Sequence, residues 1–174
     1  MKKFVAIFVC LILLFSVTVA AEPETEMVVQ MIYQEGKYTG QVVGGVPHGY
    51  GAFVAVNSEG VQWHYLGEWV NGNMSGQGGK YFDSGESYVG LWEAGVMVCG
   101  ELHIAPSTNM WCDTRADEQG RVKAKFFRMD GSVYFDGYVD SKTSKPVEGT
   151  IYAKDGTILT SGIIGEGFNW NLIY

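Results

Sequence analysis

Proline, histidine and cysteine are scarce in this chain of 174 residues, which has 4 Pro, 3 His and 3 Cys beside 24 Gly. Without more proline, the glycine content does not suggest collagen. Charged side chains make up 18% of the chain and no stretch sustains a helical period, so a coiled coil and a disordered acidic tail are also disfavoured. The length instead suits one globular or repeat domain, which needs no disulfide to bury a sizeable core.

The first 21 residues have the features of a secretory signal peptide. Lys2 and Lys3 form a positive start, Phe4–Val19 is almost entirely apolar, and small residues end at Ala21. We expect cleavage after Ala21 and export, to the periplasm or the extracellular space. The alternative is an uncleaved membrane anchor, for which a run of about 17 apolar residues is at the short limit.

Basic residues are few beyond the leader, where 10 of them face 19 acidic residues and give a net charge of −9. Residues 22–113 carry 11 acids against only Lys37 and Lys80, whereas residues 114–174 carry eight charges of each sign. Nucleic acids and anionic membranes are bound largely by Lys and Arg, so neither is an expected partner. The half nearer the leader should repel acidic partners most strongly.

Aromatic residues and glycines recur with a period of 23 residues. The two aligned sets are Tyr65, Tyr88, Trp111 and Tyr134, and Trp69, Trp92, Arg115 and Tyr138. An earlier copy begins at Tyr38, 27 residues before Tyr65. The best copies read Tyr-x-Gly-x-Trp-x-x-Gly-x-x-x-Gly-x-Gly. A fixed period of this length predicts a repeated supersecondary unit.

This pattern strongly resembles the MORN (membrane occupation and recognition nexus) repeat. The segments that carry the match are Tyr38-Thr39-Gly40 with Pro47-His48-Gly49-Tyr50-Gly51, Tyr65-Leu66-Gly67-Glu68-Trp69, and Tyr88-Val89-Gly90-Leu91-Trp92. Residues 36–105 match well, and residues 106–150 match as degenerate copies. The resemblance implies a non-enzymatic module that assembles or tethers proteins. The phospholipid binding often proposed for the family is disfavoured here by the negative charge.

Each repeat is predicted to be one β-hairpin. Alternation places Tyr65, Gly67 and Trp69 on one face of a strand, and the turn pairs are Asn71-Gly72, Ser84-Gly85, Asp130-Gly131 and Asp155-Gly156. A two-residue loop at Asp130-Gly131 pairs Lys125 with Asp136, Arg121 with Asp140, and Phe127 with Tyr134. The same construction at Ser84-Gly85 places Tyr81 opposite Tyr88 and predicts an aromatic ladder along one face.

Stacked hairpins predict an all-β fold, an elongated twisted antiparallel sheet of tandem 23-residue repeats with capping strands at the C-terminal end. The expected divisions are a signal peptide (1–21), an N-terminal linker or capping strand (22–35), the repeat array (36–150) and capping strands (151–174). Little or no helix is expected after the leader.

Cys99 and Cys112 are the two cysteines beyond the leader, and export would favour a disulfide between them. A hairpin centred on Ser107-Thr108 instead places Cys112 opposite His103 and Cys99 opposite Ala116. The two sulfurs then share a face but lie roughly 13 Å apart, too far for a bridge. Pro106 is able to change this register, so the pairing stays open.

Catalytic and metal-binding residues are not convincingly grouped. No local nucleophile accompanies His48, His64 or His103, and no pair of His or Cys has the spacing of zinc ligands. We therefore expect no enzyme activity and no cofactor. Asn73-Met74-Ser75 is a glycosylation sequon, usable only if the source is a eukaryote.

Two classes of function fit the sequence. The preferred one is an exported protein-binding or self-assembling scaffold that uses the aromatic face and the open sheet edge. The alternative is a glycan or cell-surface ligand binder, in which flat rings hold sugars. The rings proposed for binding are Tyr65, Trp69, Tyr81, Tyr88 and Trp92. Beside both stands the interpretation that these rings simply pack against one another as the core.

Overall fold

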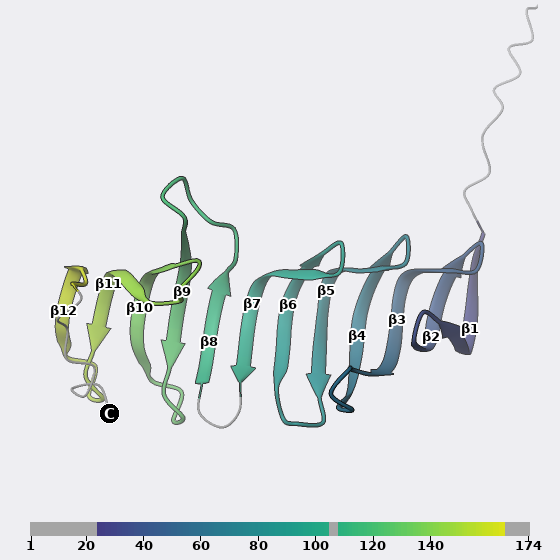
Figure 1. Ribbon diagram of the computed structural model, residues 1–174, viewed down its shortest axis with the longest axis horizontal. Coiled ribbons are helices and arrows are strands. Elements are labelled where there is room, and N and C mark those ends of the chain that lie inside the picture. The colour runs from purple at the N-terminus through teal and green to yellow at the C-terminus, as the bar shows by residue number, and fades with distance from the viewer. Residues whose placement is uncertain (1–23, 105–107, 166–174) are drawn as a thin grey trace, which may run out of the picture.

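The computed structural model describes residues 24–104 and 108–165, which form one antiparallel sheet of 12 strands in sequence order (Figure 1). The strands are β1 Thr25–Tyr33, β2 Gly36–Val43, β3 Val46–Val56, β4 Gln62–Val70, β5 Asn73–Phe82, β6 Ser87–Glu93, β7 Val96–Ile104, β8 Thr108–Asp113, β9 Arg121–Phe127, β10 Val133–Asp140, β11 Pro146–Tyr152 and β12 Ile158–Ile163. The described residues contain no helix, and so none that could cross a membrane. The all-β hairpin array is confirmed. The expected leader and residues 166–174 of the capping segment lie outside the described residues.

Two kinds of turn recur among the hairpins of the described residues. Gly44-Gly45, Asn71-Gly72 and Ala94-Gly95 are two-residue turns with positive φ at both positions, as this tight hairpin turn requires. Asn71-Gly72 was predicted correctly. The pairs Ser84-Gly85, Asp130-Gly131 and Asp155-Gly156 instead end three-residue loops, each closed by a backbone bond such as Phe82 N to Glu86 O at 2.9 Å. The glycine of each loop has positive φ, which typifies a type I turn followed by a left-handed residue.

The extra loop residue corrects part of the predicted register. Tyr81 lies opposite Ser87, and Lys80 lies opposite Tyr88, so the predicted Tyr81–Tyr88 pair is wrong by one position. Because side chains alternate, this shift places Tyr81 on the other face of the sheet. The predicted ladder therefore has Lys80 where Tyr81 was expected.

The hairpin of β9 and β10 starts one position off the prediction and returns to it through a bulge. Phe127 lies opposite Val133 rather than Tyr134, but beyond the bulge Lys125 lies opposite Asp136, as predicted. Lys125 Nζ is 2.8 Å from the Asp136 carboxylate. Arg121 also lies opposite Asp140 as predicted. Its guanidinium, however, pairs with the carboxylates of Asp117 and Glu148.

A row of glycines crosses the sheet and shows where the sequence period fails. Neighbouring strands contribute to this glycine row, in order, Gly40, Gly51, Gly67, Gly78, Gly90, Gly100, Cys112, Ala124, Gly137 and Gly149. Tyr65 and Tyr88 each stand two residues before a member of the row. In the later copies Met110 and Phe135 hold that place, so aligning Trp111 and Tyr134 with Tyr65 was wrong. The 23-residue spacing drifts because the connections around β8 differ in length from those of the first copies.

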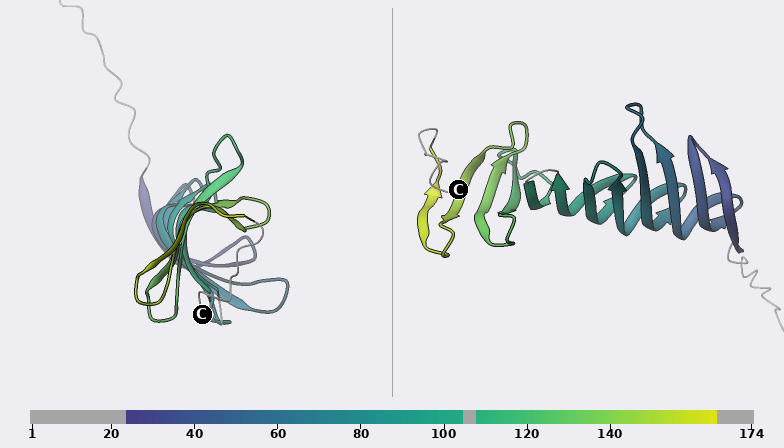
Figure 2. Two further views of the ribbon diagram at one scale, coloured as in Figure 1. Left: turned by 90° about the vertical axis from the view of Figure 1, so that its left-hand side faces the viewer. Right: turned by 90° about the horizontal axis from the view of Figure 1, so that it is seen from below.

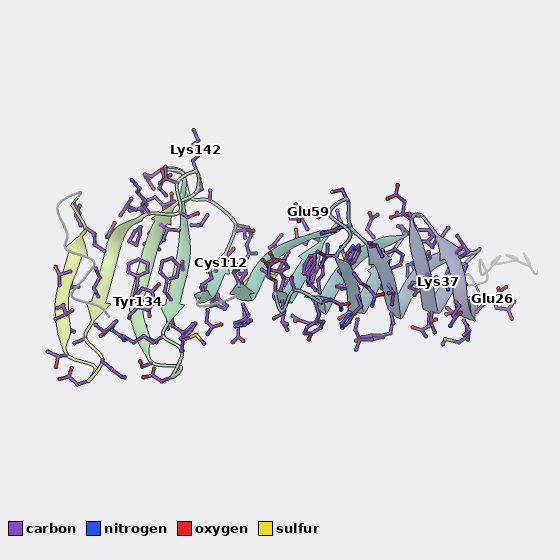
Figure 3. All side chains as sticks on the ribbon, turned by 60° about the horizontal axis from the view of Figure 1, so that its bottom comes forward. Glu26, Lys37, Glu59, Cys112, Tyr134 and Lys142 are labelled. Carbon is purple, nitrogen blue, oxygen red and sulfur yellow. The ribbon has the colours of Figure 1, made fainter. Side chains whose placement is uncertain are left out.

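The sheet curls along its length into an open trough, as the end-on view shows (Figure 2). We call the face that carries the buried side chains the inner face and the other the outer face. Buried residues form two clusters, one around Tyr38, Tyr65, Trp69 and Trp92 and one around Phe135, Val139 and Ile151. Leu102 of β7 packs against both. Figure 3 shows the side chains along the sheet, with Cys112 near the junction of its two halves.

Candidate functional site

The predicted aromatic face is largely a packed core. The side chains of Tyr65, Trp69 and Trp92 are at most 5% exposed. Tyr65 lies edge-on to both tryptophans, with ring centroids 5.4 Å apart in each pair. Such edge-to-face contacts stabilise a core beyond the area they bury. These three rings offer no open face on which a sugar could stack.

The polar atoms of these rings are bonded within the sheet. Trp92 Nε1 donates to the carbonyl of Gly78 at 3.0 Å, and Trp69 Nε1 donates to that of Gly51 at 3.3 Å. The Tyr65 hydroxyl donates to the carbonyl of Glu68 at 3.1 Å. Burial, with a smaller contribution from the Glu68 carboxylate, raises the pKa of Tyr65 to about 12. The glycine row exists because these rings lie over it: a Cβ on Gly78 would meet the Tyr65 hydroxyl at 2.1 Å.

The other two proposed binding rings lie on different faces. Tyr88 is half-buried on the inner face, edge-on to Phe82 at 5.7 Å. Tyr81 is 37% exposed on the outer face and stacks on His64, with centroids 5.2 Å apart. The structure therefore groups Tyr65, Trp69, Tyr88 and Trp92 and separates Tyr81 from them.

Lys80 is the inner-face residue that the sequence interpretation missed. It lies between Tyr65 and Tyr88 in neighbouring strands, and its Nζ is 3.9 Å from the centroid of Trp63. No carboxylate pairs with it in the described part of the chain, and burial lowers its pKa. The contact with Trp63 is a cation–π interaction that partly offsets the loss of water. Knowledge of the three-residue loop would have placed Lys80 correctly by simple alternation.

Cys99 and Cys112 are free thiols on opposite faces of the sheet. Cys112 lies opposite Gly100, and Cys99 lies opposite Asp113, so the expected partners His103 and Ala116 were wrong. Because successive residues point to opposite faces, the two Cβ atoms point apart and cannot be bridged without moving the backbone. The expectation that both sulfurs share a face was also wrong. Burial is the main cause that raises the pKa of the Cys112 thiol.

The histidines lie apart from one another. His48 is in β3, His64 stacks on Tyr81, and His103 Nδ1 is hydrogen-bonded to Asn109 Oδ1. Within residues 24–104 and 108–165, no group of three or more His, Cys, Asp and Glu could hold a metal ion. The exposed Asn73 of the sequon begins β5 beside a tight turn.

The strands at the two edges of the sheet, β1 and β12, expose apolar side chains. In β1, Met27 is 70%, Val29 78% and Ile32 72% exposed; in β12, Ile163 is 88% exposed. No other strand of the described residues pairs with the outer edge of β1 or of β12. Such edges are templates for strand addition. β1 carries one charge, Glu26, and β12 carries none.

Charge is divided unevenly along the sheet. Residues 24–104 contain 9 acidic and 2 basic residues, a net of −7, whereas residues 108–165 contain 8 of each. Every ion pair found among the described residues joins partners between Asp113 and Lys154. The strands from β1 to β7 therefore carry an uncompensated negative field.

Taken together, the fold and the aromatic, glycine-marked hairpins define a tandem β-hairpin repeat protein. Residues 38–58 and 65–87, which span most of β2 to β5, match the MORN repeat. These two segments are MORN repeats, and the resemblance seen in the sequence is confirmed for them. MORN repeats are non-enzymatic modules that generally bind proteins or membranes as scaffolds. No curated protein matches the chain.

Proposed function

We propose that this protein is an exported, non-enzymatic scaffold that assembles by adding strands to its open sheet edges, with a second copy of itself as the first partner. The observation that carries the proposal is the pair of apolar, nearly uncharged edge strands at the two ends of one sheet. Burial of Tyr65, Trp69 and Trp92 favours this function over the glycan-binding alternative.

Two stretches of β1, one on each side of a bulge, have the regular geometry needed to pair with an incoming strand. A bulge at Val29 and Gln30 separates two regular stretches paired with β2, and Gln30 N donates to Thr39 Oγ1 at 3.0 Å. The bulge twists the middle of the edge, so an incoming strand would pair on one side of it. Ile32 lies in the regular stretch next to the first turn and exposes most of its side chain.

The β12 edge completes the proposed interface. Ile158 and Ile163 are both exposed, and residues 158–163 include no Pro and no charged residue. Natural sheets usually protect such edges with Lys, Pro or a covering segment. Pairing β12 of one copy with β1 of the next joins unlike surfaces, which generates an open chain of molecules rather than a closed dimer.

Export is supported by the leader, with Lys2, Lys3 and the apolar run that ends near Ala21. Outside the cytosol, a strongly acidic protein stays soluble while its uncharged edges meet. The intact mass of protein from its native source tests this step. A mature chain that begins at Glu22 supports export, and a chain that retains Phe4–Val19 contradicts a cleaved leader.

Sedimentation equilibrium over a concentration series tests edge assembly. We expect the average mass of the wild-type protein to rise with concentration. Ile32→Lys should raise the dissociation constant at least about tenfold, which corresponds to ~1.4 kcal/mol. A charge on the edge must be desolvated on pairing, whereas the isolated molecule leaves it in water.

Leu66→Lys is the matched control, since Leu66 is 64% exposed on the outer face of a central strand. It should leave association unchanged, and both variants should melt like the wild type. A wild-type protein that stays monomeric at every concentration contradicts self-assembly. Loss of association in Leu66→Lys alone would place the interface on the outer face instead of the edge.

A further inference from the structure

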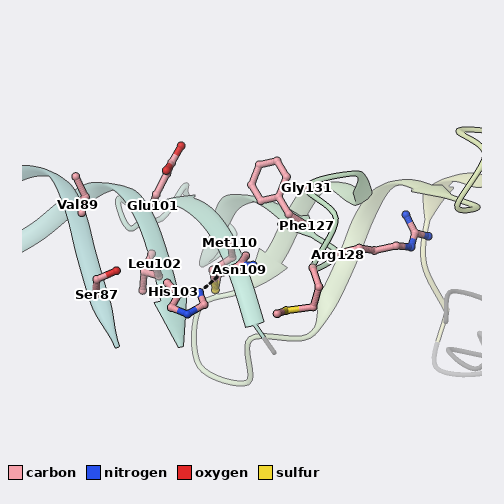
Figure 4. A pocket seen from close by; sticks show the side chains of 11 residues that line it. Ser87, Val89, Glu101, Leu102, His103, Asn109, Met110, Phe127, Arg128 and Gly131 are labelled. Atoms are coloured by element: carbon pink, nitrogen blue, oxygen red, sulfur yellow. Dashed lines mark hydrogen bonds between the residues drawn. The ribbon is translucent and has the colours of Figure 1, made fainter. Parts of the chain in front are cut away.

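A cavity on the outer face, at the junction of the two core clusters, has no role in edge assembly. It has a volume of about 310 Å³ and is bounded by β6, β7, β8, β9 and the loop after β9 (Figure 4). Its apolar wall includes Val89, Phe127 and Met129. Its polar groups include Glu101 and His103. Small-molecule sites commonly combine an apolar wall with a few converging polar groups.

Two of the polar side chains that line the cavity, those of Glu101 and His103, can accept hydrogen bonds. His103 Nδ1 is hydrogen-bonded to Asn109 Oδ1, so Nε2 is the ring nitrogen left to accept a hydrogen bond when it carries no proton. The Glu101 carboxylate has no hydrogen bond or ion pair in the described part of the chain, although it lines the cavity. Figure 4 shows Glu101 and Phe127 at the upper rim and the bonded His103–Asn109 pair below them.

Two of the nearby cations, Arg128 and Lys125, are engaged elsewhere. Arg128 belongs to the wall, but its guanidinium donates to the carbonyls of Val133 at 3.0 Å and Tyr152 at 2.7 Å, and it points away from the cavity in Figure 4. Lys125, in the adjoining hollow that also contacts Glu101, is held by Asp136. Lys123 lines the same hollow but not the cavity, and none of the ion pairs found among the described residues joins a cation to Glu101.

The surrounding field has the sign that attracts cations. The strands from β1 to β7, which supply Glu101 and His103, belong to the half with a net charge of −7. Trp111 lies directly opposite Glu101 and lines the adjoining hollow, whereas Phe127 lines both the hollow and the cavity. An aromatic ring beside a carboxylate adds a cation–π contribution for an ammonium group.

From these contacts we infer that the cavity is a binding site for a small organic ammonium cation with an apolar, ring-sized body. The ammonium group donates to the Glu101 carboxylate and to Nε2 of His103. The apolar body lies against Phe127, Val89 and Met129. The site is distinct from the sheet edges, so it is present in monomers and in assembled molecules alike.

Titration of the purified full chain with phenethylamine, followed by amide chemical shifts in two-dimensional NMR, tests the inference. We expect saturable shifts confined to residues around Val89, Glu101 and His103, with a dissociation constant in the millimolar to high micromolar range that suits a small open cavity. Two ligands of the same shape serve as controls: neutral 2-phenylethanol and anionic phenylacetate. Each should bind at least about tenfold more weakly.

Glu101→Gln keeps the shape of the side chain and removes its charge, so it should weaken phenethylamine binding about tenfold without changing the melting temperature. Glu93→Gln is the matched control, because it removes the same charge from the same half on an exposed residue outside the cavity. Equal binding of phenethylamine and 2-phenylethanol would overturn the inference. Equal losses in both variants would also overturn it, since they would indicate attraction by the general negative field rather than a site.

Discussion

Individual side chains of the inner face stabilise the fold by packing several strands together. Trp69 contacts four other rings, those of Tyr33, Tyr38, Phe53 and Tyr65, and its Nε1 bonds the carbonyl of Gly51. A ring in this position joins β1, β2, β3 and β4 into one packed unit. Trp69, which the sequence analysis proposed as a binding residue, is therefore a packing residue of the core.

Trp69→Ala should destabilise the protein by ~3–5 kcal/mol, because it removes a buried ring and leaves a cavity that a sheet cannot collapse fully. Denaturant unfolding followed by circular dichroism measures the change. Leu66→Ala, on the outer face of the same strand, should cost less than ~1 kcal/mol. Unchanged stability of Trp69→Ala would mean that the ring is not part of the core.

The glycine row requires glycine because neighbouring strands lie too close together there for a Cβ atom. A Cβ on Gly67 would lie 2.5 Å from the Cα of Gly78 and 2.6 Å from the carbonyl oxygen of Gln77. Gly67→Ala should therefore destabilise the fold by ~2–4 kcal/mol, since backbone must move. Gly165→Ala, where nothing lies within 4 Å of the added atom, should change stability by less than ~0.5 kcal/mol. Urea unfolding of the two variants compares them, and equal stabilities would contradict close packing of the glycine row.

Buried tyrosines make the fold sensitive to alkali. Burial raises the pKa of Tyr38 and of Tyr65 from 10.0 to about 12. The folded state therefore holds these phenol protons more tightly than the unfolded chain does. The resulting stability is fully present below pH 10 and is lost as the pH rises from about 10 to about 12. The Tyr38→Phe, Tyr65→Phe double variant should show a flatter fall over this range in pH-dependent unfolding, and an unchanged fall would contradict the assignment.

At the scale of the hairpin, the loop length decides which side chains share a face. Hairpin existence and strand alternation were readable from the sequence, as were the Asn71-Gly72 turn and the Lys125–Asp136 pair. The dipeptide Ser84-Gly85 did not reveal that Asp83 also belongs to the loop, because a glycine with positive φ ends both two-residue and three-residue turns. Because of that one extra loop residue, Lys80 rather than Tyr81 lies on the inner face.

Gly85→Ala should destabilise its hairpin by about 1 kcal/mol, because φ at this position is +96° and nothing else restrains an added Cβ. Ser84→Ala in the same loop should have an effect within about 0.5 kcal/mol. Thermal melting of both variants measures the difference. Equal melting temperatures would contradict a left-handed residue at the end of a three-residue loop.

Across the whole molecule, the sequence period described the first copies better than the later ones. Cys112 and Ala124 occupy positions of the glycine row in the second half. The position two residues before the row, held by Tyr65 and Tyr88 in the first copies, is held by Met110 and Phe135 in the later ones. A constant period could not follow this drift, because insertions in the connections change the spacing without changing the pairing of strands. The cavity was missed for the same reason, since it depends on the register around β8.

Within the described residues, the open sheet has one unpaired strand edge at each end. β1 and β12 are separated by ten strands, so strand addition at one end leaves the other free for a further molecule. If no segment covers them, the ends of such a meander of hairpins make it a unit of a longer sheet, as the proposed assembly requires. Assembly should protect the backbone amides of the two end strands and leave those of the central strands unaltered.

Hydrogen–deuterium exchange of the full chain at low and high protein concentration tests this claim most directly. The account predicts that peptides covering Thr25–Tyr33 and Ile158–Ile163 exchange more slowly at high concentration, whereas peptides covering Ser87–Glu93 do not change. Exchange in the end strands that is independent of concentration, or protection confined to the central strands, would contradict assembly through the sheet edges.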